Sequence, residues 1–95
     1  MIKIWLDDER LTPDGWTLCK TYEECVELLP IATHISFDHD LGRDKTGYDV
    51  AKYIENLAVN GLNSKIEWAI HSANPVGRTN IQLAMLNAER YWNES

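Results

Sequence analysis

Three short polar clusters stand out in this sequence, because each comes directly after a run of apolar residues. They are Asp7-Asp8 with Glu9 and Arg10, then Asp38-His39-Asp40, and a longer segment from His71 to Asn80. Carboxylates that are packed together repel one another, and a divalent cation is the usual partner that relieves this repulsion. Oxygen ligands alone favour hard ions such as Mg²⁺ or Mn²⁺ over zinc. The first two clusters therefore indicate a metal site, while a solvated acidic turn with Arg10 as a surface partner is the alternative for the first.

Two histidines in these clusters are candidates for proton transfer. His39 stands between two carboxylates, which can orient an imidazole, and histidine side chains titrate near neutral pH. His71 supplies a second imidazole at the start of the third cluster. Asp40 either orients His39 or joins the metal ligands. A histidine is more often structural, so the catalytic hypothesis depends on the clusters meeting in space.

The segment 71–80, HSANPVGRTN, has the composition of an anion-binding turn at the start of a helix. Free N–H groups at a helix N-terminus attract anions, and Gly77 permits close approach of the backbone. Arg78 offers a bidentate fork for phosphate, and Ser72 and Asn74 offer hydrogen bonds to phosphate oxygens. Asn74 equally fits an N-cap, and taken alone the segment also reads as a well-capped helix.

The elements that must position these clusters alternate between strands and helices. Apolar runs predict strands over residues 2–6, 16–19, 34–37 and 66–70. Apolar residues at helical spacing predict helices over residues 22–29, 47–59 and 75–92, with Thr21 and Thr46 as N-caps. This order implies a mainly parallel sheet, whose sites lie at the carboxyl ends of the strands. If the first and third strands are neighbours, Asp7, Asp8 and Asp38 converge there.

Composition and charge bound the function. Ninety-five residues, 44% hydrophobic and 25% charged, predict one folded domain over residues 1–95. A net charge of −6 argues against binding to duplex DNA, but a local pocket for one phosphate or one nucleic-acid end is compatible with it. Two cysteines are too few for a disulfide framework. No signal peptide or membrane-spanning run is present, so we expect a cytoplasmic protein without membrane contact.

The order of these residues resembles the receiver domain of response regulators. The matching positions are the acid pair Asp7-Asp8, Asp38, Leu41, Gly47 and the Ser72-Ala73 pair. Receivers bind Mg²⁺ with the corresponding acids and accept a phosphoryl group on the corresponding aspartate. The sequence departs from ordinary receivers because no helix fits between the first two strands and no fifth strand with the receiver's lysine follows. The absence of this lysine argues against phosphotransfer signalling.

A closer resemblance covers nearly the whole chain. The runs LDDER, SFDHDLG, TGYDV and HSANPVGRTN are similar to those of the cyclic-phosphate processing receiver-like family, a compact receiver derivative. The resemblance implies a receiver-like, flavodoxin-like α/β fold of three layers, with a mainly parallel sheet of about four strands and about three helices. It also implies action on cyclic phosphates at RNA ends or on related nucleotides.

This resemblance assigns expected roles to the clusters. Asp7, Asp8 and Asp38 would hold Mg²⁺ or Mn²⁺, and His39 and His71 would divide the acid and base roles. The expected phosphate-binding residues are Arg78, Ser72, Asn74 and Arg10. We therefore expect a metal-dependent phosphoesterase, a hydrolase of 2′,3′-cyclic phosphate RNA ends or cyclic nucleotides. The alternatives are a non-enzymatic receiver-like module that binds a nucleotide or protein through the acidic pocket, and a conventional phosphoacceptor receiver.

Overall fold

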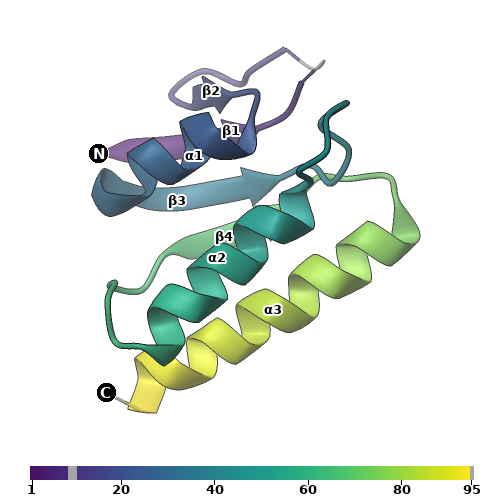
Figure 1. Cartoon of the computed structure of the whole chain (residues 1–95). Helices are drawn as coiled ribbons and strands as arrows, with labels where there is room; N and C mark the ends of the chain where they lie inside the picture. The colour runs from purple at the N-terminus through teal and green to yellow at the C-terminus, as the bar shows by residue number, and fades with distance from the viewer. Residues whose placement is uncertain (9–10, 95) are drawn as a thin grey trace.

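The computed structural model describes residues 1–8 and 11–94, and it contains the predicted strands and helices (Figure 1). In chain order the elements are β1 (Ile2–Leu6), β2 (Thr17–Cys19), α1 (Tyr22–Leu28), the 3₁₀ turn η1 (Leu29–Ile31), β3 (Ala32–Phe37), α2 (Gly47–Val59), β4 (Glu67–Ile70) and α3 (Pro75–Glu94). The ends differ from the sequence prediction by only one or two residues. Among the helices described, none combines the length and the apolar character that crossing a membrane requires.

The four strands form one parallel sheet in the order β2-β1-β3-β4. In this sheet Leu6 of β1 is level with Cys19 of β2 and with Phe37 of β3, and Phe37 is level with Ile70 of β4. The last residues of all four strands therefore lie in one row. Whatever follows each strand is delivered to the same edge of the sheet, as parallel topology requires.

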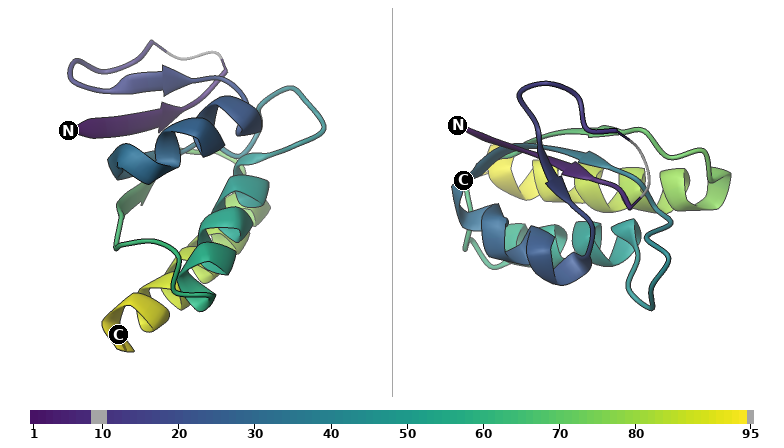
Figure 2. Two further views of the ribbon diagram at one scale, coloured as in Figure 1. Left: turned by 60° about the vertical axis from the view of Figure 1, so that its left-hand side comes forward. Right: turned by 90° about the horizontal axis from the view of Figure 1, so that it is seen from above.

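The α/β fold class is confirmed. The structure has two layers, the sheet and one layer of helices, where three layers were expected. In Figures 1 and 2 the three helices lie on one side of the sheet, with α3 running alongside α2 and the outer edge of β4. The β2-to-β3 and β3-to-β4 crossovers run in the same direction along the sheet, so right-handed connections place their helices on the same face. The connection over residues 7–16 contains no helix in its described part, and no described helix covers the other face.

The core lies between the sheet and this single helix layer. Fully buried apolar residues of the central strands β1 and β3 meet fully buried apolar residues of the helices there. They are Ile4, Leu6, Ile35 and Phe37 from the strands, and Cys25, Val50, Ile54, Ile81 and Met85 from the helices. Complete burial stabilises each large apolar side chain by roughly 1.5–3 kcal/mol. The strand ends that carry the polar clusters are therefore anchored in a tightly packed core.

Aromatic side chains, rather than a helix, partly cover the opposite face of the sheet. Trp5 of β1 points to this face and meets Trp16 edge-on, with ring centroids 5.7 Å apart. The Trp16 ring also meets His34 edge-on, at 6.3 Å, and the Lys3 ammonium lies 5.3 Å from its centroid. The helix-free face thus has its own small layer of side chains, which reaches towards the carboxyl edge of the sheet.

The start of α2 is fixed by a capping box, which also anchors the loop before it. The Thr46 hydroxyl accepts a hydrogen bond from the Asp49 N–H, at 3.4 Å, and the Asp49 carboxylate accepts one from the Thr46 N–H, at 2.7 Å. Burial opposes ionisation of Asp49, but the bonds from Thr46 and the charge of Lys52 outweigh it and lower the pKa of this carboxyl. The N-cap predicted at Thr46 is confirmed.

Both cysteine thiols are expected to be unreactive in the folded protein. Burial, with a smaller contribution from the charge of Glu24, raises the pKa of Cys19 to about 11, and burial also raises the pKa of Cys25. Since the thiolate is the reactive form, a raised pKa leaves almost none of it at pH 8. Ellman's reagent at pH 8 should therefore label neither thiol in native buffer and both in denaturant; rapid labelling of the native protein would contradict the buried placement.

Candidate metal and phosphate site

The sheet delivers one residue of each polar cluster to the same place through backbone hydrogen bonds. Asp7 N–H donates to the Cys19 carbonyl at 3.1 Å, and Asp38 N–H donates to the Leu6 carbonyl at 2.8 Å. His71 N–H donates to the Phe37 carbonyl at 2.9 Å. These bonds continue the strand ladders by one residue beyond β1, β3 and β4. The predicted convergence of the three clusters is therefore a direct result of parallel pairing.

The three aspartates expected to bind metal form one cluster. Asp7, Asp8 and Asp38 each offer a carboxylate oxygen, and these oxygens all lie within 4.8 Å of one another. Asp7 is completely buried, whereas Asp8 and Asp38 are partly exposed, so the cluster opens to solvent on one side. Three hard oxygen donors at this spacing fit Mg²⁺ or Mn²⁺, and the open side leaves positions for water or substrate. Asp40 is exposed and is not a member of this cluster.

His71 is largely enclosed by protein atoms. Its Nε2 lies 3.0 Å from Oδ2 of Asp7, and its Nδ1 lies 2.8 Å from the Ser36 hydroxyl. The ring stacks on Trp5, with centroids 3.8 Å apart and planes 3° from parallel. Only 12% of the side chain is exposed. Sequence reasoning placed His71 near the acids but missed Ser36 and Trp5, because neither residue type signals a site by itself.

His39 has a different environment. Its backbone N–H donates to Oδ1 of Asp38 at 2.8 Å, which fixes the two residues relative to each other. The imidazole packs against Gly77 at the start of α3, and its Nδ1 is buried with no hydrogen-bond partner among the described residues. A buried polar atom without a partner costs free energy unless a water or ligand satisfies it. His39 thus has one ring nitrogen, Nδ1, that no described residue engages.

Glycines approach the site closely at three points. A Cβ on Gly42, which has a φ of +65°, would lie 2.9 Å from Oδ2 of Asp8. A Cβ on Gly47 would collide with the Asp38 carbonyl, and one on Gly77 would lie 2.6 Å from Cβ of His39. Gly77 permits a close approach to the backbone, as predicted. The group that approaches it in the structure is the His39 ring rather than an anion.

The segment after β4 uses its polar side chains largely to hold its own shape. Asn74 Oδ1 accepts a hydrogen bond from the Gly77 N–H at 2.9 Å and so caps α3, while Asn74 N–H donates to the Ser72 hydroxyl at 3.1 Å. Arg78 Nη1 donates to the carbonyls of Ile70, at 3.2 Å, and Ser72, at 3.0 Å. The N-cap alternative for Asn74 is confirmed, and the phosphate-binding roles stay predictions. Arg10, the remaining predicted phosphate contact, lies outside the described residues.

Asp40 is linked to this segment rather than to His39. Its Oδ2 accepts a hydrogen bond from Asn74 Nδ2 at 3.5 Å, a long and exposed contact. The contact joins the loop after β3 to the loop after β4 on the outer side of the site. Two roles were expected for Asp40, to orient His39 or to bind metal. Its described contacts support neither role.

For the cyclic-phosphate hydrolysis expected from the sequence, with His39 as a proton carrier, substitution of Gly77 by alanine should lower turnover by about 10²-fold, since displacing a catalytic group by about 1 Å can cost that much. The new methyl group would push the His39 ring out of place. The clash should cost about 1–3 kcal/mol of stability, offset in part by the gain of about 1 kcal/mol from alanine in a helix, so the protein should stay folded with a modestly lower melting temperature. Steady-state kinetics and thermal unfolding check both points. Thr79→Ala, an exposed position on the same helix, is the control, and equal kcat for both variants would contradict this role of Gly77.

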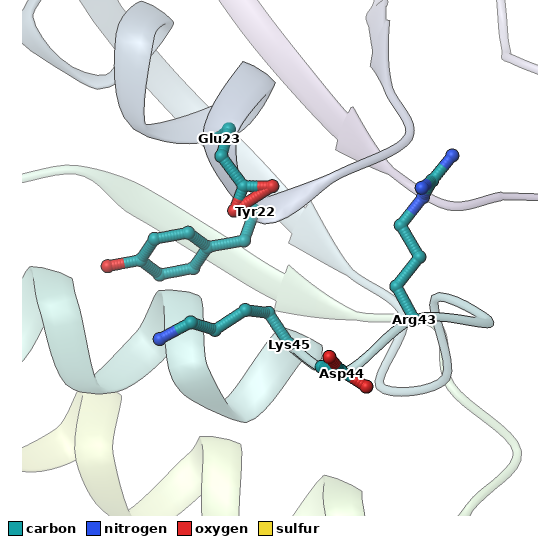
Figure 3. A pocket seen from close by; sticks show the side chains of 5 residues that line it. All are labelled: Tyr22, Glu23, Arg43, Asp44 and Lys45. Atoms are coloured by element: carbon teal, nitrogen blue, oxygen red, sulfur yellow. The ribbon is translucent and has the colours of Figure 1, made fainter.

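A separate hollow of about 300 Å³ lies beside the site and does not include its acids. Figure 3 shows its lining side chains, which are Tyr22, Glu23, Arg43, Asp44 and Lys45. The Lys45 ammonium lies 4.9 Å from the centroid of the Tyr22 ring, whereas Arg43 extends away from that ring (Figure 3). Two cations and two carboxylates balance in charge here, so the hollow carries no clear preference for an anion.

The comparison with known families agrees with this geometry. A family model described as the cyclic-phosphate processing receiver domain matches residues 2–87, which include every described residue of the site. Neither the curated proteins nor the solved structures contain a significant match.

Proposed function

Since the chain belongs to the family of cyclic-phosphate processing receiver domains, we propose that it is a metal-dependent phosphoesterase. The proposed reaction is hydrolysis of a cyclic phosphate, either the 2′,3′-cyclic end of an RNA or a cyclic nucleotide. The observation that supports this most is the cluster of Asp7, Asp8 and Asp38, whose carboxylates lie within 4.8 Å of one another beside His39.

Ring opening consumes one water molecule. The water oxygen forms a bond to phosphorus, one phosphorus–oxygen bond to the sugar breaks, and the sugar oxygen takes up a proton while the water loses one. A bound Mg²⁺ or Mn²⁺ supplies charge neutralisation on the phosphoryl oxygens. The three carboxylates would hold this ion, with Asp7 shielded from solvent and Asp8 and Asp38 on the open side.

His39 is the better placed of the two histidines for proton transfer. Its Nδ1 has no partner among the described residues, whereas both ring nitrogens of His71 lie within hydrogen-bond distance of protein oxygens. A positioned histidine typically accelerates such a step by about 10²–10⁴-fold. We assign to His39 the proton exchanged with the attacking water or with the leaving sugar oxygen.

The phosphoryl oxygens would face the loop that follows β4. Arg78 has five N–H donors, and the contacts to Ile70 and Ser72 use only its Nη1. The other donors of the guanidinium provide a fork for a phosphoryl oxygen pair. Ser72 and Asn74 would contribute mainly by holding this loop, because they bond to one another and to the start of α3.

A substrate panel tests the proposal. Short RNAs that end in a 2′,3′-cyclic phosphate, free cyclic nucleotides and plain monoesters are incubated with Mg²⁺, with Mn²⁺ or with EDTA, and the products are separated by chromatography. Metal-dependent loss of a cyclic ester, but not of monoesters, is the expected result. Equal loss in EDTA would contradict the role of the metal.

The second candidate is a module that binds a nucleotide without turning it over. It is favoured by the hydrogen bonds within the loop after β4. They engage the N–H groups of Asn74 and Gly77 and the Nη1 of Arg78, and so leave fewer donors for a transition state. In the panel, tight nucleotide binding without turnover on any substrate would favour the module over the enzyme.

A further inference from the structure

We propose that Ser36, His71 and Trp5 form a positioning chain that fixes the Asp7 carboxylate for binding of a divalent cation. This inference rests on the proposed metal site. The chain consists of the Ser36 hydroxyl, 2.8 Å from His71 Nδ1, and of His71 Nε2, 3.0 Å from Asp7 Oδ2. Trp5 completes it by stacking on the imidazole.

The strand pairing of the sheet places the residues of this positioning chain next to one another. Trp5 of β1 and Ser36 of β3 are direct partners in the parallel register, so their side chains lie side by side on the helix-free face. His71 follows β4 and lies over both of them. A helix would cover this place in a three-layer sheet; here the imidazole covers it, and Asp7 is completely buried behind it.

The direction of the hydrogen bonds follows from the donors available. The Asp7 carboxylate only accepts, so Nε2 of His71 carries the hydrogen in that contact. In the neutral ring that carries its hydrogen on Nε2, Nδ1 accepts from the Ser36 hydroxyl, and in the imidazolium form Nδ1 donates to the same hydroxyl, so the contact serves both forms. Ser36 is 3% exposed, which leaves its hydroxyl little access to water as another partner. Asp7 thus selects hydrogen on Nε2, and Ser36 is the second anchor that fixes the tilt of the ring against Asp7.

Binding of Mn²⁺, measured by isothermal titration calorimetry without substrate, tests the chain. Loss of a partner that orients a metal ligand typically lowers affinity by 10–100-fold. We expect losses in this range for Ser36→Ala, and for His71→Phe, which keeps a flat ring against Trp5 but removes both hydrogen bonds. The matched controls are Thr33→Ala and His34→Phe on the same strand, which should leave the affinity unchanged.

Nitrogen-15 NMR of the imidazole gives a readout independent of metal and of turnover. The wild-type His71 ring should carry hydrogen on Nε2, and Ser36→Ala should shift the Nδ1 resonance, because that nitrogen loses its hydroxyl partner. Hydrogen on Nδ1 alone in the wild type, or wild-type Mn²⁺ affinity in both variants, would overturn the proposal, as would a wild-type protein that binds no Mn²⁺.

The two proposals fail in different ways. Weakened Mn²⁺ binding in the variants together with no turnover on any ester would overturn the phosphoesterase and support the positioning chain. If both variants retain turnover and bind Mn²⁺ with unchanged affinity, the positioning chain is overturned and the phosphoesterase is not. Thermal unfolding of each variant shows whether the fold is intact, and Ser36→Ala removes only one oxygen atom from the core.

Discussion

Asp38→Asn should abolish metal-dependent opening of a cyclic phosphate, with a loss of turnover of about 10³-fold. Its carboxylate is the member of the cluster contributed by β3, and the amide that replaces it is a neutral and much weaker ligand. Stabilisation of transition-state charge by a metal is worth several kcal/mol, and about 4 kcal/mol corresponds to this loss. Turnover of a 2′,3′-cyclic nucleotide with Mn²⁺ measures it.

Thermal unfolding separates this effect from misfolding. Asp38→Asn removes one of three neighbouring negative charges, so the metal-free variant should be at least as stable as the wild type. The rise in melting temperature that Mn²⁺ produces in the wild type, by binding the folded state, should be lost. Asp40→Asn, an exposed carboxylate in the same loop, is the control and should keep both activity and the Mn²⁺ effect. A variant of Asp38 with normal turnover would contradict the proposed site.

His39→Ala should lower kcat by about 10²–10⁴-fold, the usual contribution of one positioned acid or base. The affinity for Mn²⁺ should stay close to that of the wild type, because the contact of His39 to Asp38 is made by the backbone N–H, which alanine keeps. Comparison of kcat with the Mn²⁺ dissociation constant therefore tells proton transfer apart from damage to the metal site.

Added imidazole provides a further check on this variant. The cavity left by the ring beside Gly77 is large enough to be filled by free imidazole, which should restore part of the lost turnover. His34→Ala, on the opposite end of β3, is the matched histidine control and should retain full activity. Full activity in His39→Ala would remove this residue from the reaction.

The amino-acid sequence by itself determined the parts that rest on local interactions. Alternating apolar runs and helical spacing predicted the strands and helices, and the N-caps at Thr21 and Thr46 were visible because capping joins residues three apart. The gathering of Asp7, Asp8 and Asp38 followed from one further rule, that parallel strands end at a common edge. The acidic cluster was therefore predictable on the condition that β1 and β3 are neighbours, as they are in the structure, although its spacing was not predictable.

Only the tertiary structure decided what depends on residues far apart in the chain. His71 and Asp7 are 64 positions apart, and nothing in the local sequence indicates that Ser36 and Trp5 hold the imidazole between them. The two histidines are alike in sequence, each beside polar residues at a strand end. Packing nevertheless gives both ring nitrogens of His71 protein partners, whereas Nδ1 of His39 has none among the described residues. The single helix layer has the same origin, since the face that a helix covers is set by the direction and handedness of crossovers rather than by any residue within it.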